Sequence, residues 1–117
     1  MKENKIQELT FAFSLQIINL YKILVEQKEY VLSKQLLRST TSIGANVEEA
    51  TAAQTKKDFT MKMSIASRET RYWLRLLEKS KLVDYNYFSY LTSIEHIINI
   101  LTKIVKTSQE NLTPKPI

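Results

Sequence analysis

The sequence predicts an all-α protein, an antiparallel up-down-up-down bundle of four helices. The 117 residues include a single glycine and two prolines, so the turn residues that usually separate strands are nearly absent. Apolar residues instead recur every three or four positions along most of the chain, which is the helical period. The predicted connections are short, and short connections join antiparallel neighbours. We expect one domain over residues 1–110 and a flexible C-terminal tail over 111–117.

The first helix is expected to begin near Asn4 and to end around residues 27–29. Its stretch from Leu9 to Leu24 is apolar but contains Gln16 and Lys22, and it is shorter than the ~20 apolar residues that span a membrane. We therefore expect a core helix and no membrane partner. Its core-facing residues are Ile6, Leu9, Phe13, Ile17, Leu20 and Leu24.

The second helix is predicted from about Val31 to Gln54 and contains Gly44, the only glycine of the chain. Glycine inside a helix costs ~1 kcal/mol relative to alanine, so we expect Gly44 to permit close packing of the bundle. The apolar face of this helix consists of Leu32, Leu36, Ile43, Val47 and Ala50.

One flank of the second helix is rich in small polar side chains, and two interpretations remain open. The first is a solvated face with one close helix crossing at Gly44. The second is a hydrogen-bonded network between helices, in which Glu48 or Glu49 pairs with Arg68 or Arg71, because a buried charge needs such a partner. The residues of this flank are Gln35, Arg38, Ser39, Ser42, Asn46, Glu49 and Ala53.

The third helix is predicted to begin at a capping box formed by Thr55 and Asp58. Its apolar surface is wider than a helix packed only within its own bundle requires. Either the core is generous, or the second flank is an interface between subunits. The predicted core residues are Phe59, Met63, Ala66, Thr70, Trp73 and Leu77, and the second apolar flank consists of Met61, Ile65, Tyr72 and Leu76.

Positive charge is concentrated on the side of the third helix that faces away from the core. The net charge is +5, and residues 56–81 alone hold eight basic and three acidic side chains. This basic stripe is either an ordinary solvated face or a surface that neutralises phosphates, and Tyr72 beside it suits stacking on a base. The residues of the stripe are Lys57, Arg68, Arg71, Arg75 and Lys79.

The fourth helix follows Asp84, a plausible N-cap, and no residue in it indicates catalysis. His96 is the only histidine, and Ser93 stands where a di-iron bundle would place a glutamate. The chain has no cysteine, which excludes disulfides and thiolate metal sites and suits a reducing cytoplasm. We expect no metal, no cofactor and no enzymatic activity. The predicted core residues are Phe88, Leu91, Ile94, Ile98, Leu101 and Val105.

Residues 35–50, 57–59 and 62–77 resemble the four-helix-bundle proteins encoded within intervening sequences of 23S ribosomal RNA genes. The resemblance implies a bacterial, cytoplasmic homopentamer. It also implies kinship with the accessory variability protein of diversity-generating retroelements, which binds a reverse transcriptase and nucleic acid. The residues of the shared structural or oligomer motif are Arg38, Ser39, Ser42, Gly44, Asn46, Glu49, Glu69, Tyr72 and Trp73.

Two functions follow as expectations. The first is a non-catalytic homo-oligomer that binds RNA or DNA through the basic stripe, or that serves as an accessory subunit of a reverse transcriptase or another nucleic-acid enzyme. The second is a protein–protein scaffold whose basic stripe pairs with an acidic partner or a neighbouring subunit. A nuclease that depends on Glu49 is a remote third hypothesis.

Overall fold

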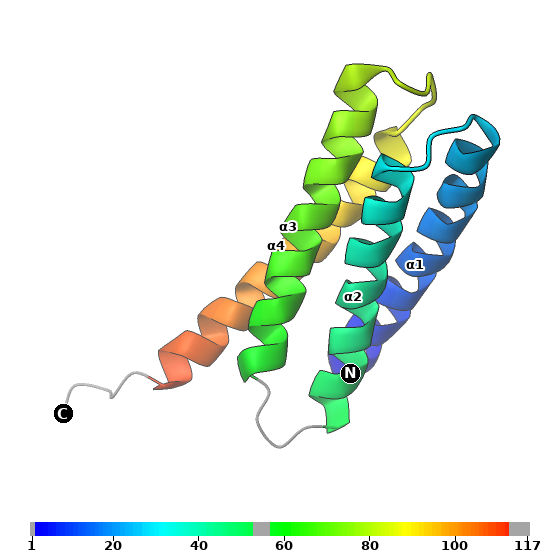
Figure 1. The fold of residues 1–117 in the computed structure, drawn as a ribbon. Coiled ribbons are helices and arrows are strands. Elements are labelled where there is room, and N and C mark those ends of the chain that lie inside the picture. The colour runs from blue at the N-terminus through cyan, green and yellow to red at the C-terminus, as the bar shows by residue number, and fades with distance from the viewer. Residues whose placement is uncertain (1, 53–56, 113–117) are drawn as a thin grey trace.

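Four long helices pack side by side in an up-down-up-down arrangement (Figure 1). The computed structural model describes residues 2–52 and 57–112, with side chains described from residue 5 to residue 107 outside the gap. The predicted all-α bundle is confirmed. The helices are α1 (Lys2–Glu26), α2 (Leu32–Ala52), α3 (Lys57–Ser80) and α4 (Phe88–Leu112).

The turn between α1 and α2 is closed by backbone hydrogen bonds and a cap. Lys28 adopts a left-handed conformation with a φ of 66°, and the backbone N–H of Glu29 donates to the carbonyl of Leu24 at 2.9 Å. This pattern satisfies the free carbonyls at the end of a helix. The Glu29 carboxylate then accepts a hydrogen bond from the backbone N–H of Ser33 at 2.6 Å and so caps α2.

The start of α4 differs from the sequence prediction. The Asn86 side chain, and not that of Asp84, accepts a hydrogen bond from the backbone N–H of Phe88, at 3.0 Å. Phe88 was predicted in the core, but it is 72% exposed, whereas Tyr87 is 2% exposed. Because consecutive residues of a helix point about 100° apart, beginning α4 at Phe88 turns that ring outward and leaves the core position to Tyr87.

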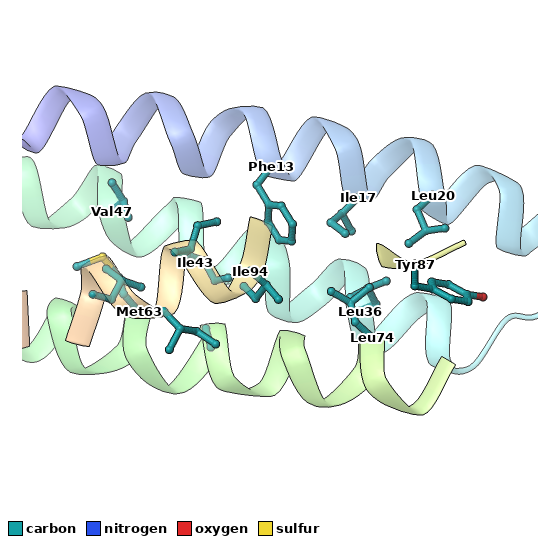
Figure 2. Packing of buried hydrophobic residues seen from close by; sticks show 14 of the residues in the cluster. Phe13, Ile17, Leu20, Leu36, Ile43, Val47, Met63, Leu74, Tyr87 and Ile94 are labelled. Carbon is teal, nitrogen blue, oxygen red and sulfur yellow. The ribbon is translucent and has the colours of Figure 1, made fainter. Parts of the chain in front are cut away.

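The core runs along the bundle axis and takes residues from all four helices (Figure 2). On α3 its centre lies at Leu74 and Thr70, both fully buried, while Phe59 and Trp73 are half-buried at its edge. The sequence prediction thus placed Trp73 in the core where the structure has Leu74. Because α3 packs between α2 and α4, the centre of its buried face is rotated by one residue from the predicted position. Ile97 of α4 is a fully buried residue that the sequence prediction missed.

The N-terminal helix is long and apolar enough, from Lys5 to Glu26, to meet the length and composition criteria for a membrane span. Ile17, Leu20 and Leu24 of this helix are fully buried in the core, whereas Phe11 and Leu15 are exposed. The predicted capping residue Thr55 and the predicted tail from residue 113 onward lie outside the described residues. Backbone of α4 continues to Leu112, slightly beyond its expected end.

Candidate nucleic-acid interface on helix α3

The basic stripe lies on the outer side of α3 and runs along its whole length. Lys57 stands in the first turn and Lys79 in the last, and both are exposed, as are Arg68 and Arg75 between them. A helix rises 1.5 Å per residue, so these cations span roughly 33 Å. An elongated polyanion could contact several of them at once.

Acidic side chains leave most of this charge unneutralised. Arg68 Nη2 donates a long hydrogen bond of 3.4 Å to the neutral Thr102 Oγ1 of α4. Lys79 Nζ lies 3.9 Å from Glu78 Oε1, and an exposed pair at that distance contributes almost nothing. Within the described part of the chain, Lys57 and Arg75 form no ion pair. The stripe therefore presents free positive charge to solvent.

Arg71 differs from the rest of the stripe because it forms an ion pair with α4. Its Nη1 lies 2.8 Å from Glu95 Oε1. The pairing of Glu48 or Glu49 with Arg68 or Arg71 that the sequence suggested is thus wrong. Both arginines turn toward α4, whereas those glutamates stand on α2, on the other side of α3.

The carboxylates of α2 lie elsewhere. Glu48 Oε2 accepts a hydrogen bond of 3.5 Å from Gln7 Nε2 of α1. Glu49 is exposed and has no ion pair with another described residue. The residues of α4 that do touch the stripe, Glu95 and Thr102, were not singled out from the sequence. Glu95 and Thr102 are seven residues apart and so lie on one face of α4, and this spacing could have indicated that both face the same neighbouring helix.

On the opposite edge of α3, a polar cluster links this helix to α2. Arg38 Nη2 forms an ion pair with Glu69 Oε2, and the same carboxylate oxygen accepts a hydrogen bond from Trp73 Nε1 at 3.3 Å. Arg38 Nε also donates to Gln35 Oε1 at 3.0 Å. The cluster orients the indole ring and fixes the edge of α3 against α2. Because its ion pair is substantially exposed, it adds at most about 1 kcal/mol to stability.

A second polar link between α2 and α3 is buried. Thr70 Oγ1 donates to Ser39 Oγ at 2.9 Å, and both side chains are fully buried. Ser39 Oγ in turn lies 3.2 Å from the backbone carbonyl of Leu36. The hydrogen-bonded network between helices that the sequence allowed thus exists, built from hydroxyl groups and not from the predicted ion pairs.

Farther along α2, Ser42 and Asn46 face a shallow depression toward α3. Asn46 Nδ2 donates to the backbone carbonyl of Ser42 at 2.8 Å, so its side chain lies along its own helix. Lys62, Ile65 and Glu69 of α3 line the same depression, whose volume is about 190 Å³. Ser42, Asn46 and Glu69 of the motif therefore share one side of the bundle.

Gly44 lies on the other side of α2, facing α1. A Cβ atom added there would meet Ser14 Oγ at 3.5 Å, an ordinary van der Waals distance. The close helix crossing predicted at Gly44 is therefore wrong for packing within this chain. The glycine instead lines an open groove of about 250 Å³ between α1 and α2, bordered by the exposed ring of Phe11.

The second apolar flank of α3 is exposed beside the basic stripe. Ile65 is 63% exposed and Tyr72 is 56% exposed, whereas Leu76 is half-buried. The Tyr72 ring packs edge-on against Trp73, with the ring centroids 5.2 Å apart. On the helix, Tyr72 stands one turn from both Arg68 and Arg75, so its ring and two guanidinium groups share one surface.

The described side chains contain no cluster of three or more His, Asp, Glu or Cys residues able to hold a metal ion. His96, the only histidine, is exposed on α4. The arrangement offers cations, one exposed aromatic ring and apolar side chains. Groups of this kind suit contacts with anions, bases or a partner surface.

The sequence pattern of the family described as 23S rRNA-intervening sequence protein matches residues 2–103. Among solved structures, the chain is similar to a protein of unknown function from the S23 ribosomal protein family of Bacteroides thetaiotaomicron VPI-5482. The two are 45% identical, the match covers 91% of this chain and 99% of the other, and the TM-score is 0.80. A comparison with curated proteins finds no match.

Proposed function

The chain belongs to the family of 23S rRNA-intervening sequence proteins, and we propose that it is a non-catalytic, homo-oligomeric protein that binds RNA. The observation that carries the proposal is the positive charge of Lys57, Arg68, Arg75 and Lys79 along the exposed side of α3, which the described acidic side chains leave almost unneutralised. Phosphate contacts by Lys and Arg provide most of the affinity of such proteins for nucleic acid. The proposal places the protein in the bacterial cytoplasm.

Arg71 has a different role in this proposal from the other four cations. A phosphate would have to compete with Glu95, which already lies 2.8 Å from the Arg71 guanidinium. We therefore assign the phosphate contacts to the other four residues of the stripe. Tyr72, between Arg68 and Arg75, supplies a ring on which a base can stack.

Removal of three cations from the stripe tests the proposal. The full-length variant Arg68→Ala, Arg75→Ala, Lys79→Ala should bind labelled RNA more weakly than the unmodified protein at low salt. The slope of log K against log salt concentration should fall in magnitude by about 2 to 3, because each lost phosphate contact removes 0.7 to 0.9. Fluorescence anisotropy across a salt titration measures both quantities.

The matched control removes the same number of charges from elsewhere on the surface. Lys5, Lys22 and Lys34 are exposed on α1 and α2. Their triple alanine variant has the same net charge as the stripe variant but should keep the salt slope of the unmodified protein. Equal losses in the two variants, or no RNA binding by the unmodified protein at low salt, would refute the proposal.

A second candidate function is a protein–protein scaffold, including an accessory subunit of a reverse transcriptase or another nucleic-acid enzyme. The exposed apolar side chains of Ile65 and Tyr72 beside the stripe favour it, because exposed apolar patches mark interaction surfaces. In that case the cations of α3 pair with acidic residues of a partner or a neighbouring subunit. Oligomers that dissociate on removal of the stripe, with RNA binding absent, would favour this function over the first.

A further inference from the structure

The two connections 27–31 and 81–87 lie at the same end of the bundle, which we name the loop end (Figure 1). They are far apart in sequence but adjoin in space. Burial is the main cause that raises the pKa of Tyr87 to about 12, and the negative charge of Glu29 in the other connection adds to it. The loop end therefore carries the residues of both connections at one end of the bundle.

Large apolar side chains are concentrated on this surface. Ten large apolar side chains are exposed among the described residues, and five of them belong to the loop end. The core does not need them, because Val83 and Tyr87 from the same region already point inward and are buried. Exposed apolar clusters of this kind mark binding surfaces. The five residues are Tyr30, Val31, Leu82, Tyr85 and Phe88.

Two lysines at the loop end hold a backbone conformation that favours glycine. Lys28 has a φ of 66° and Lys81 a φ of 57°, and both side chains are exposed. The left-handed conformation costs a residue with a Cβ roughly 1–2 kcal/mol. Proximity of the cation to the carbonyl end of a helix offsets part of that cost. At Lys28 this conformation closes the end of α1, and it directs the lysine side chain to solvent.

The combination of exposed rings and cations is the chemistry that binds single-stranded nucleic acid. Rings stack on unpaired bases, and lysines contact the backbone between them. The loop end also continues the basic stripe, since the segment from Arg75 to Lys81 carries three cations and one acidic residue, Glu78. Of the two acidic side chains in these connections, Glu29 is engaged in capping α2 and Asp84 is exposed. A strand lying along the stripe would therefore reach the loop end.

The geometry points to the loop end as a site for unpaired nucleotides of RNA, an inference that rests on the RNA-binding function proposed above. Tyr30, Tyr85 and Phe88 stack on the bases, while Lys28 and Lys81 contact the phosphates. Bases inside a duplex are already stacked on one another and offer these rings nothing to bind. The stripe contacts the backbone of either form, whereas the loop end adds affinity only for the unpaired form.

The test compares full-length variants on two probes, a short unstructured RNA and a duplex that contains the same strand. Tyr30→Ser with Phe88→Ser removes two exposed rings and should weaken single-strand binding at least about thirtyfold, with duplex binding unchanged. The control Phe11→Ser removes an equally exposed ring from α1, outside the loop end, and should change neither. Circular dichroism and thermal unfolding verify that each variant is folded.

A second variant tests the lysines without loss of the fold. Lys28→Gly with Lys81→Gly relieves the left-handed conformation, so the protein should be at least as stable as the unmodified chain. The salt slope of single-strand binding should fall in magnitude by about 1.4, which is 0.7 for each of two phosphates. Lys5→Ala with Lys22→Ala removes the same charge elsewhere and should leave the slope unchanged.

The outcomes separate this inference from the proposed function. Loss of the preference for single strands in both loop-end variants, with duplex binding retained, supports the inference. If both variants bind single strands as the unmodified protein does, the inference fails while RNA binding through the stripe stands. If the unmodified protein binds neither probe at low salt, the proposed function fails and the inference fails with it.

Discussion

At the single residue Gly44, the cost of a glycine inside a helix is not matched by close packing against a neighbouring helix. The only glycine of the chain lies inside α2, where it weakens the helix. The sequence suggested that a close helix crossing compensates for this. The structure leaves room for a Cβ atom beside Ser14 and shows that the glycine lines a groove facing α1. Within one chain the cost is therefore not offset by packing.

Substitution of this glycine should consequently stabilise the isolated fold. Gly44→Ala is expected to raise the free energy of unfolding by up to about 1 kcal/mol, because alanine favours the helix and its Cβ fits. Urea unfolding measures it as a higher midpoint with an unchanged m-value. Ala45→Gly, at the exposed neighbouring position, should lose a similar amount. A Gly44→Ala protein less stable than the unmodified chain would contradict this account.

At the scale of elements, the contact between α2 and α3 is held by two polar links of unequal value. The pair between Arg38 and Glu69 is exposed to solvent, which screens its charges. The hydrogen bond between Thr70 and Ser39 is buried and contributes about 0.5–1.5 kcal/mol, while each hydroxyl also lies within hydrogen-bond distance of a carbonyl of its own helix. The hydroxyl pair therefore specifies how these two helices meet.

A double-mutant cycle measures that link. Ser39→Ala and Thr70→Val should each destabilise the protein, with a coupling free energy of about 0.5–1.5 kcal/mol between them, as for a direct hydrogen bond. The control is Thr41→Val, since that exposed hydroxyl bonds only to carbonyls of its own helix. Its pairing with Thr70→Val should show no coupling. Strictly additive effects of Ser39→Ala and Thr70→Val would mean that the buried bond contributes nothing.

At the scale of the whole molecule, α3 presents an exposed apolar flank that the bundle itself does not use. Ile65 and Tyr72 are both more than half exposed, and Met61 is also exposed. Burial of Ile65 and Met61 in contacts between subunits agrees with the homo-oligomer we propose, and it leaves the Tyr72 ring available to a base. Such contacts would also bring the basic stripes of several chains into one assembly, which multiplies the charge available to RNA.

The proposed assembly can be tested at Ile65. Ile65→Asp should leave the fold of the subunit intact, because the side chain is 63% exposed, but it should dissociate the oligomer by burying an unpaired charge. Size-exclusion chromatography with light scattering measures the mass. Val31→Asp, an exposed apolar position at the loop end, is the control and should keep the mass of the unmodified protein. An unmodified protein that is monomeric at micromolar concentration would exclude this interface.

Local patterns were enough to locate the helices and most of the core. Phe13, Ile17 and Leu36 are buried as their helical spacing predicted. The sequence prediction was wrong at positions where the rotation of a helix about its axis decides which side chain is buried. Phe88 points outward although it follows the apolar period, because α4 begins one residue after Tyr87, which occupies the core. A shift of one residue turns a side chain by about 100°, and no local pattern specifies it.

The sequence by itself determined the four helices, their antiparallel order and the concentration of basic residues in α3. These properties depend on residues close together in the chain. Only the tertiary structure decided that Arg71 pairs with Glu95, that Gly44 lines a groove, and that two distant connections with exposed aromatic side chains lie at the same end of the bundle. Each depends on how neighbouring helices are rotated and placed, which is set by the packing of all four together.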